Sequence, residues 1–273
     1  MSDQADKAHR FRTLHQAADS FVIANAWDAG SARMLTALGF KALATSSGAC
    51  AGVLGRRDGT VSRTEALAHC KAIVEATDLP VSADLENGFG DTPEAAAEAI
   101  RLAAEIGLVG ASIEDATGDP AQPLFEPAHA ADRIVAAVEA ARSMSFPFTL
   151  TARAENYLRG NPDLDDTIRR LRSFQAAGAD VLMAPGLPDL DAVRAVCAAL
   201  SRPVNFMAGI TGKSFAVAAL SAAGVKRISL ATSLYRAAMT GLFEAAKEVR
   251  ESGTFGYLDR TLPTPAFNAF MDE

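Results

Sequence analysis

The stretch PVSADLENGFGD, residues 80–91, decides how the chain is built, because a short apolar run ends in it beside a group of acids. Its first half is made of the small residues typical of a strand covered on both faces. Asp84 and Glu86 follow directly, before an Asn-Gly turn. In parallel α/β folds the chemistry lies at the carboxyl ends of strands. The stretch therefore predicts a buried parallel strand that delivers carboxylates to a functional site.

Runs of the same kind recur along the whole chain, separated by Ala-rich stretches of helical period. They are FVIANAW (21–27), KALATSS (41–47), GASIED (110–115), FTLTARAE (148–155), DVLMAPG (180–186), VNFMAGI (204–210) and RISLATS (227–233). Eight strands alternating with helices predict an α/β fold, a (β/α)8 TIM barrel. A doubly wound open sheet is the rival, but NAWDAGSAR after the first run does not fit GxGxxG.

Local signals mark where the intervening helices begin and end. Ser62 or Thr64 with Glu65 nearby, the run from Asp91 to Glu94 and the run from Asp163 to Asp166 are typical of helix starts. The helices are expected to stop at glycine, as listed here: Gly39, Gly107, Gly178 and Gly224. GITGKS (209–214) resembles part of a P-loop but has the wrong glycine spacing, so we expect a glycine-rich turn with Ser214 starting a helix.

The bulk properties indicate one domain over residues 1–273, with residues 240–273 as a C-terminal helical extension. The apolar tail of this extension, Phe267, Phe270 and Met271, is expected to pack on its own barrel or on a neighbouring subunit. Net charge is −7 with no dense basic run, which argues against nucleic acid and anionic membranes as partners. No membrane span, signal peptide or disulfide framework is visible, so we expect a cytoplasmic protein.

Acids gather at the predicted strand ends in a pattern that suits a hard divalent cation. Asp84 and Glu86 follow the third strand, Glu114 ends the fourth, and Asp58 lies in the long loop after the second. Asp84 and Glu86 are two apart and would face the same way along an extended strand. Magnesium takes oxygen ligands and needs only one or two direct carboxylates. Arg153, at the end of the fifth strand, is expected opposite the acids.

Small residues at the end of the second strand predict an anion cradle. Successive backbone N–H groups of Ser46, Ser47 and Gly48 could turn toward a ligand anion, although an ordinary tight turn is the alternative. Asn205 on the seventh strand is a further candidate for substrate binding. Cys50 lies in the following loop, where a packing role and a catalytic thiol both remain open.

Histidine and lysine positions argue against other mechanisms. The four histidines fall in the N-terminal lead or in helical stretches, so a zinc site or a Ser-His-Asp triad is not expected. No lysine projects from a strand end as a Schiff-base nucleophile would, which makes a class-I aldolase a weak interpretation.

In combination these residues resemble a known family, the isocitrate lyase/phosphoenolpyruvate mutase superfamily. The matching pieces run in order over roughly residues 20–240: NAWDAGSAR, the TSSG turn, the Asp58-Gly59 pair, ADLENGFG, SIEDA and TARAE. The chain looks most similar to the 2-methylisocitrate lyase-like and oxaloacetate decarboxylase-like branch.

The resemblance implies Mg²⁺ (or Mn²⁺) held directly at Asp84, with Asp58, Glu86 and Glu114 acting largely through bound waters. It implies that the backbone of residues 46–48 holds a 2-oxo acid and that Arg153 binds its carboxylate or oxyanion. The shared chemistry passes through a metal-bound enolate of a pyruvate-like unit. The resemblance also implies a homodimer or homotetramer whose eighth helix is exchanged between subunits. The candidate catalytic residues are Arg153, Glu114, Asp58 and Cys50.

One loop departs from the family pattern. The lyases carry KKCGH after the fourth strand, whereas residues 115–134 here read DATGDPAQPLFEPAHAADRI, without cysteine or lysine. The mutase-type loop with lysine and asparagine is also absent. We therefore expect decarboxylation or another C–C cleavage of a small 2-oxo or 2-hydroxy di- or tricarboxylic acid, oxaloacetate being the simplest. Cys50, Tyr157 and metal-bound water remain alternative proton donors.

Two other functions stay open. One is P–C bond chemistry of the phosphonopyruvate hydrolase or mutase type. The other is a non-catalytic 2-oxo acid binding protein on the same barrel.

Overall fold

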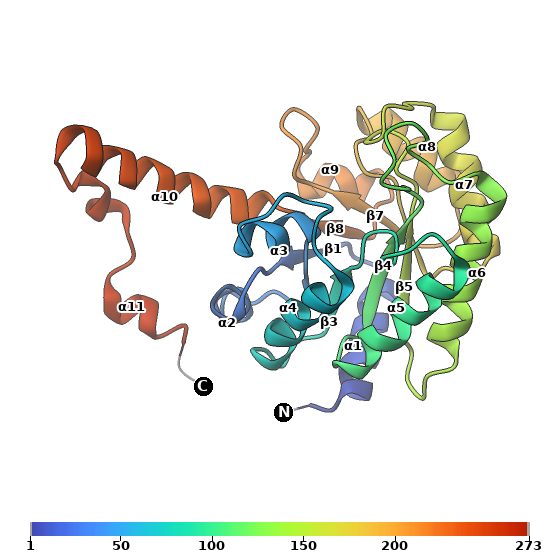
Figure 1. The fold of residues 1–273 in the computed structure, drawn as a ribbon, viewed down its shortest axis with the longest axis horizontal. Coiled ribbons are helices and arrows are strands. Elements are labelled where there is room, and N and C mark those ends of the chain that lie inside the picture. The colour runs from blue at the N-terminus through green and yellow to red at the C-terminus, as the bar shows by residue number, and fades with distance from the viewer. Residues whose placement is uncertain (1, 272–273) are drawn as a thin grey trace.

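The computed structural model describes residues 2–271, and within them eight parallel strands close into a barrel in chain order (Figure 1). The strands are β1 (Phe21–Asn25), β2 (Leu43–Ala44), β3 (Val81–Asp84), β4 (Gly110–Glu114), β5 (Thr149–Arg153), β6 (Val181–Met183), β7 (Val204–Met207) and β8 (Arg227–Ser229). β8 pairs with β1 and completes the ring. The predicted (β/α)8 barrel is confirmed, and the open-sheet rival is wrong because the sheet has no free edge.

Helices cover the outside and one end of this barrel. They are α1 (Gln4–Gln16), α2 (Ala29–Ala37), α3 (Ser47–Val53), α4 (Arg63–Glu75), α5 (Pro93–Glu105), α6 (Pro127–Arg142), α7 (Leu164–Ala176), α8 (Leu190–Ala199), α9 (Val217–Ala222), α10 (Ser233–Ser252) and α11 (Thr264–Asn268), with a 3₁₀ turn η1 (Gly256–Arg260). Phe11 of α1 packs with Ile23 and Val109 in a small buried cluster. α1 therefore closes the amino-terminal end of the barrel and leaves the carboxyl end open for a site.

Helix starts follow the predicted caps. Ser62 caps α4 in a capping box with Glu65, Thr92 caps α5, and Asp163 caps α7. Gly178, after α7, has a φ of +101°, a backbone conformation that a side chain would disfavour. Ser214 does not start a helix, because α9 begins at Val217 after Ala216.

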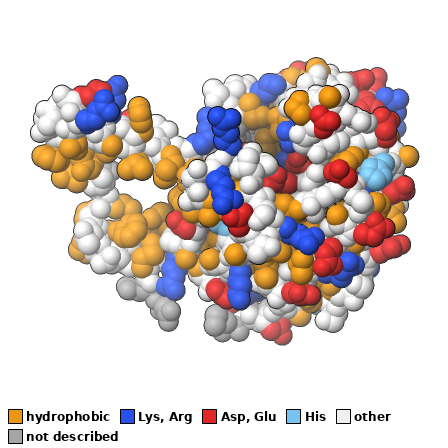
Figure 2. Space-filling model, in the orientation of Figure 1, with side chains coloured by type: hydrophobic (Ala, Val, Ile, Leu, Met, Phe, Trp, Pro, Cys, Tyr) orange, Lys and Arg blue, Asp and Glu red, His pale blue; other side chains and the backbone are white. Residues whose placement is uncertain are grey.

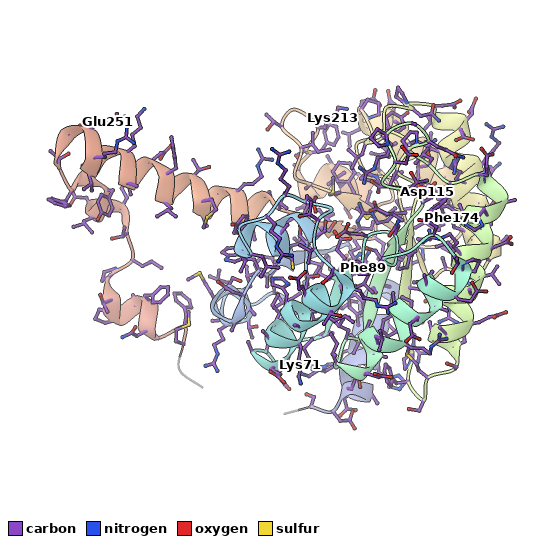
Figure 3. The ribbon with its side chains drawn as sticks, viewed as in Figure 1. Lys71, Phe89, Asp115, Phe174, Lys213 and Glu251 are labelled. Atoms are coloured by element: carbon purple, nitrogen blue, oxygen red, sulfur yellow. The ribbon has the colours of Figure 1, made fainter. Side chains whose placement is uncertain are left out.

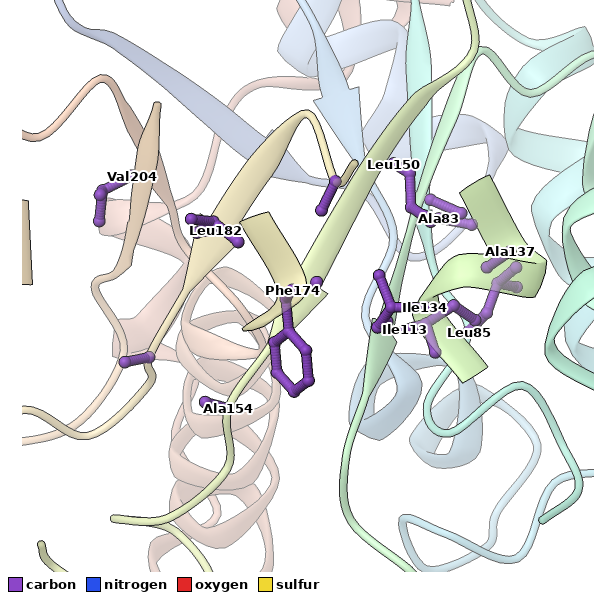
Figure 4. Close-up of a cluster of buried hydrophobic side chains, with 14 of the residues drawn as sticks. Ala83, Leu85, Ile113, Ile134, Ala137, Leu150, Ala154, Phe174, Leu182 and Val204 are labelled. Atoms are coloured by element: carbon purple, nitrogen blue, oxygen red, sulfur yellow. The ribbon is translucent and has the colours of Figure 1, made fainter. Parts of the chain in front are cut away.

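The apolar core is a shell between the strands and the outer helices. Outward-facing side chains of the strands, such as Ala83, Ile113 and Leu150, pack with Ile134 and Ala137 of α6 (Figure 4). Small alanines let helix and sheet approach closely, and their burial drives the assembly. Inside the barrel the side chains are mostly polar, which leaves room along its axis.

The C-terminal part leaves the barrel as an extended arm (Figures 1 and 2). α10 projects away with none of its residues buried, and α11 turns back toward the barrel. The backbone oxygen of Met271 accepts a hydrogen bond from Arg33 of α2 at 2.6 Å, while Phe267 stays 45% exposed. The extension boundary expected at residue 240 falls inside α10, since that helix begins at Ser233.

Among the described residues, no helix combines the length and the apolar character needed to cross a bilayer.

Candidate active site

A cavity of about 510 Å³, here called the central cavity, opens at the carboxyl ends of the strands. Its walls receive side chains from every strand of the barrel or from the residue that follows it. The polar and charged lining residues are Asn25, Thr45, Ser46, Ser47, Asp58, Ser82, Asp84, Glu86, Ser112, Glu114, Arg153, Glu155, Arg159, Asn205, Arg227, Ser229, Thr232 and Arg236. The cavity is therefore polar from its mouth down into the barrel.

Arg153 lies at the centre of the charged groups. Its guanidinium approaches Asp84 at 2.9 Å, Glu114 at 3.1 Å and Glu155 at 2.9 Å. Burial opposes its charge, but Glu155, Glu114 and Asp84 outweigh that cost and hold the pKa of Arg153 well above its ordinary value. Arg153 was expected opposite the acids. It lies among them instead, because β5 is the direct neighbour of β4 and places Arg153 beside Glu114.

Burial and mutual repulsion act on the acids themselves. Burial raises the pKa of Glu114 to about 7, although Arg153 works against the shift. Burial, followed by repulsion from Asp84, Asp58 and Glu114, raises the pKa of Glu86 to about 7. The carboxyl groups are thus crowded on this side of the central cavity, and their ionised forms are destabilised there.

The turn after β3 differs from the expected extended strand. β3 ends at Asp84, and Glu86 has a φ of +50°, so the two-residue alternation does not apply across Leu85. Both acids nevertheless line the central cavity. The backbone N–H of Glu86 donates to Asp84 at 3.3 Å, which folds the turn back over the strand end.

Residues 46–48 form neither an open loop nor a tight turn. Ser46 caps the short helix α3, and the backbone N–H of Ser47 donates to Asp84 at 3.2 Å. A Cβ at Gly48 would stand 2.8 Å from the methyl group of Thr232 and 3.2 Å from Asp58. A side chain at residue 48 would therefore force Thr232 or Asp58 to move. The predicted cradle is therefore a helix start that contacts the acid group.

The remaining candidates fall in different places. Asp58 is exposed at the rim of the central cavity, and Asn205 is fully buried in its wall. Cys50 does not line the central cavity, because α3 turns it toward Ala51, Val61 and Ala66. Burial raises the pKa of the Cys50 thiol to about 11. Its position favours the packing role over the catalytic one.

The side chain that follows Glu114 points the other way. Asp115, labelled in Figure 3, pairs with Arg170 of α7 at 3.1 Å and accepts from the backbone N–H of Glu155 at 2.8 Å. The alternation along β4 thus directs one acid into the central cavity and the next toward the outer helices.

Three cations of the central cavity were missed by the sequence reading. Arg159 pairs with Glu114 at 3.0 Å, Arg236 lies on α10, and Arg227 begins β8. The sequence contains one indication of Arg159, because it stands four residues after Glu155, a spacing that allows an ion pair. The two side chains pair at 4.0 Å. Arg227 begins β8, and the rule that places chemistry at the carboxyl ends of strands does not point to a strand start.

The donor set fits a magnesium ion that keeps much of its water. Asp84, Glu86, Glu114 and Asp58 are hard oxygen donors, and the repulsion on Glu86 is the kind that a cation relieves. Within the described part of the chain, no three acidic, histidine or cysteine side chains form a ready ligand group. Magnesium itself needs only one or two direct carboxylates and keeps several of its waters.

A closed barrel with charged side chains gathered at the carboxyl ends of its strands defines a (β/α)8 barrel enzyme. Comparison with known proteins narrows this class. The family model for phosphoenolpyruvate phosphomutase matches residues 11–250. The chain therefore belongs to the phosphoenolpyruvate phosphomutase family, within the phosphoenolpyruvate mutase/isocitrate lyase superfamily of lyases and mutases.

Individual relatives agree with this family. The crystal structure of a proposed lyase/mutase from Burkholderia cenocepacia J2315 is 49% identical, with a TM-score of 0.97 over 99% of this chain and 97% of that one. Oxaloacetate decarboxylase of Paraburkholderia xenovorans is 30% identical over 97% of this chain and 88% of its own length. 2-Methylisocitrate lyase of Bacillus subtilis is 31% identical over 68% of this chain and 62% of its own.

Proposed function

We propose that the protein is a Mg²⁺-dependent lyase that cleaves a C–C bond in a small 2-oxo or 2-hydroxy di- or tricarboxylic acid. Decarboxylation and retro-aldol or Claisen-type cleavage are the reactions in view. The observation that carries the proposal is Arg153, buried in the wall of the central cavity and in contact with Asp84, Glu114 and Glu155. A fixed positive group surrounded by carboxylates suits a reaction in which negative charge appears on oxygen.

Each part of the central cavity has a role in this proposal. Asp84 would hold Mg²⁺ (or Mn²⁺), with Asp58, Glu86 and Glu114 reaching it through water. A bound ion would supply Lewis-acid stabilisation of the charge that develops as the bond breaks. Arg153 would orient the substrate carboxylate or oxyanion, and Asn205 in the buried wall would donate to a polar substrate atom.

The segment after β4 favours a reaction that does not require a proton-donating side chain on a mobile loop. It folds on itself, with an isolated antiparallel bridge between Ala116 and Leu124 and a hydrogen bond of 2.6 Å from Thr117 to the carbonyl of Gln122. It carries neither cysteine nor lysine. Carbon dioxide leaves without being protonated, and the enolate that remains can take its proton from water, so decarboxylation does not depend on an acidic side chain in this segment.

A panel assay tests the proposal. Purified protein with Mg²⁺ is offered oxaloacetate, 2-methylisocitrate and related acids, and pyruvate or carbon dioxide release is followed. We expect turnover of at least one acid, lost with a chelator and lost in Asp84→Ala. The conservative control is Asp78→Asn, an exposed change at a site remote from the central cavity. Folded protein that turns over no member of the panel would overturn the proposal.

The family match favours a second candidate, P–C bond chemistry on phosphonopyruvate. Phosphate release from phosphonopyruvate in the same assay would support it over the first. Tight 2-oxo acid binding measured by calorimetry, without turnover of any of these compounds, would instead support a binding protein.

A further inference from the structure

A second buried guanidinium lies deeper in the barrel than Arg153. Arg227, the first residue of β8, is 5% exposed and lines the floor of the central cavity. Its Nε donates to Asn205 at 2.8 Å, one Nη donates to Thr151 at 2.9 Å, and the other stands 3.4 Å from His15. Thr151 and Asn205 are themselves fully buried. The guanidinium is therefore held in a fixed position inside the protein.

All of these partners are neutral. Among the described residues no carboxylate forms an ion pair with Arg227, whereas Arg153 contacts Asp84, Glu114 and Glu155. His15 adds no charge of its own. The backbone oxygen of Phe11 lies 2.9 Å from its Nδ1, so that nitrogen carries the proton and Nε2 accepts from Arg227. A buried cation without a counter-charge is costly, and an anion would offset that cost.

Arg227 still has donors to offer. A guanidinium carries five N–H groups, and the contacts with Asn205, Thr151 and His15 use one each. Small polar side chains leave Arg227 accessible from the cavity. Ser82, Ser112 and Ser229 line it at positions where bulky branched residues usually fill a barrel.

We infer that Arg227 forms a small-anion subsite at the floor of the central cavity, suited to a carboxylate group. The planar fork of a guanidinium matches carboxylate geometry, and the 5% exposure of Arg227 favours a small anion over a large one. Thr151 precedes Arg153 by two residues on β5, so the subsite lies roughly 7 Å below Arg153 along the strand.

Two sources of the carboxylate fit this position. One is the second carboxylate of a short diacid whose 2-oxo end lies near Asp84 and Arg153, and this use rests on the proposed function. The other is a separate small anion such as acetate or formate. The subsite itself needs neither Mg²⁺ nor turnover, so it can be tested apart from the proposed function.

The first experiment uses metal-free protein and sodium acetate as the probe. Thermal unfolding is followed as acetate is added, with ionic strength held constant by the bulkier anion HEPES. We expect saturable stabilisation of the wild type, weakened at least tenfold in apparent affinity in Arg227→Gln. Arg202→Gln is the matched control, because it removes the same charge from an exposed arginine, and its acetate response should stay within twofold. Equal responses of wild type and Arg227→Gln would overturn the inference.

A second measurement covers the case in which Arg227→Gln does not fold. Wild-type crystals soaked in sodium bromide should show anomalous density beside the Arg227 guanidinium. Bromide bound elsewhere on the protein, with none at Arg227, would overturn the inference without any variant.

A third arm identifies the source of the anion. With Mg²⁺ present, oxalate can engage only the cation end, whereas 2-oxoglutarate has a distal carboxylate. A tenfold loss of 2-oxoglutarate affinity in Arg227→Gln, with oxalate within twofold of wild type, supports the diacid. Unchanged affinity for both, with the acetate response lost, supports a separate anion. If neither acid binds with Mg²⁺, the result counts against the proposed function, while the acetate result still decides the subsite.

Discussion

Arg153 and Arg227 are both buried in one barrel, yet their surroundings differ in charge. Arg153 stands among Asp84, Glu114 and Glu155, so its charge is more than balanced. Arg227 is surrounded by neutral donors and acceptors, and burial lowers its pKa to about 9. It remains protonated at neutral pH. The same cavity therefore has an upper region rich in carboxyl groups around Arg153 and a floor with one buried cation, Arg227.

Gly48 offers a test of the cavity wall at the scale of one methyl group. In Gly48→Ala the new Cβ would meet Thr232 at 2.8 Å and Asp58 at 3.2 Å, so one of them must move. We expect kcat/KM for the active acid to fall at least tenfold, with the unfolding temperature lowered by only a few degrees. Steady-state kinetics and thermal denaturation measure the two effects.

Gly30→Ala is the matched control for that change, because its Cβ would make only ordinary contacts at 3.7 and 3.9 Å. Activity in Gly48→Ala equal to that of Gly30→Ala would show that the wall at residue 48 does not touch the substrate.

His15 predicts a pH dependence of stability. Burial, with a contribution from the Arg227 charge, lowers its pKa from 6.5 to about 3. Its folded-state pKa is depressed, so the unfolded chain binds the extra proton between pH 6.5 and 3 and stability falls as pH falls through this window. Each pH unit there costs up to about 1.4 kcal/mol from this residue.

We therefore expect the unfolding free energy of the wild type to drop more steeply from pH 7 to pH 5 than that of His15→Gln. Urea denaturation at pH 7, 6 and 5 gives the comparison. Parallel curves for the two proteins would contradict a neutral, buried His15.

The sequence predicts site residues where they lie at the carboxyl ends of strands, as functional residues of such barrels do. Asp84, Glu114 and Arg153 follow from this rule, and the structure places all of them in one cavity. Arg227 lies at a strand start, outside the reach of that rule, although its alternation with the outward-facing Ile228 already points it into the barrel. Contacts that depend on the ring closure, such as Arg227 with Thr151, require the three-dimensional arrangement.

At the scale of elements, α6 connects the end of β4 with the turn after β3 through one side chain. Its Arg133 is buried, lies 4.3 Å from the ring centre of Phe125, and donates to the backbone oxygens of Glu114, Asn87 and Gly90. These oxygens belong to the end of β4 and to the turn after β3, where Asp84 and Glu86 lie. One side chain of an outer helix therefore connects both acid-bearing segments.

Replacement of Arg133 should affect stability and activity together. Arg133→Met keeps much of the apolar stem but leaves those backbone oxygens without a donor, at a cost of about 3 kcal/mol. We expect that loss in urea denaturation and a fall in kcat/KM through displacement of the β3 turn. Asp132→Asn, the exposed neighbour on the same helix, should change neither. An unchanged kcat/KM in Arg133→Met would argue against a link between α6 and the site.

Elements were predictable to different degrees for physical reasons. The strands and the long helices have strong periodicity and clear caps, as at Ser62 and Asp163. α3 was missed because SGACAGV is short and small-sided, and its stability comes from the Ser46 cap and from packing on Tyr235. α9 starts at Val217 without a side-chain cap, so Ser214 was a misleading signal.

At the scale of the whole molecule, the arm stands apart from the barrel. Leu242 and Phe243 of α10 are 61% and 66% exposed, and Leu258 and Leu262 beyond it are each 55% exposed. Glu251 marks the far end of α10 in Figure 3. Large apolar side chains exposed together on one arm are unusual on a free surface. We propose that they are covered by a second copy of the chain, in a homodimer or homotetramer with exchanged C-terminal helices.

Phe243→Glu tests this proposal. A charge in a covered apolar face destabilises the contact, so the mass from light scattering should fall from that of an oligomer to that of a monomer. Glu244→Ala, an exposed change on the same helix, should leave the mass unaltered. Wild-type protein that is monomeric at micromolar concentration would exclude the exchanged arrangement.

The division between an apolar shell and a polar axis also affects how the protein can change. The apolar burial that stabilises the fold involves residues outside the ring, such as Ile113 and Ile134. Ser82, Ser112 and Ser229 inside the ring contribute little to it. Libraries randomised at these serines should retain soluble, folded members in large proportion. New specificities could then be selected in the laboratory without first rebuilding the scaffold.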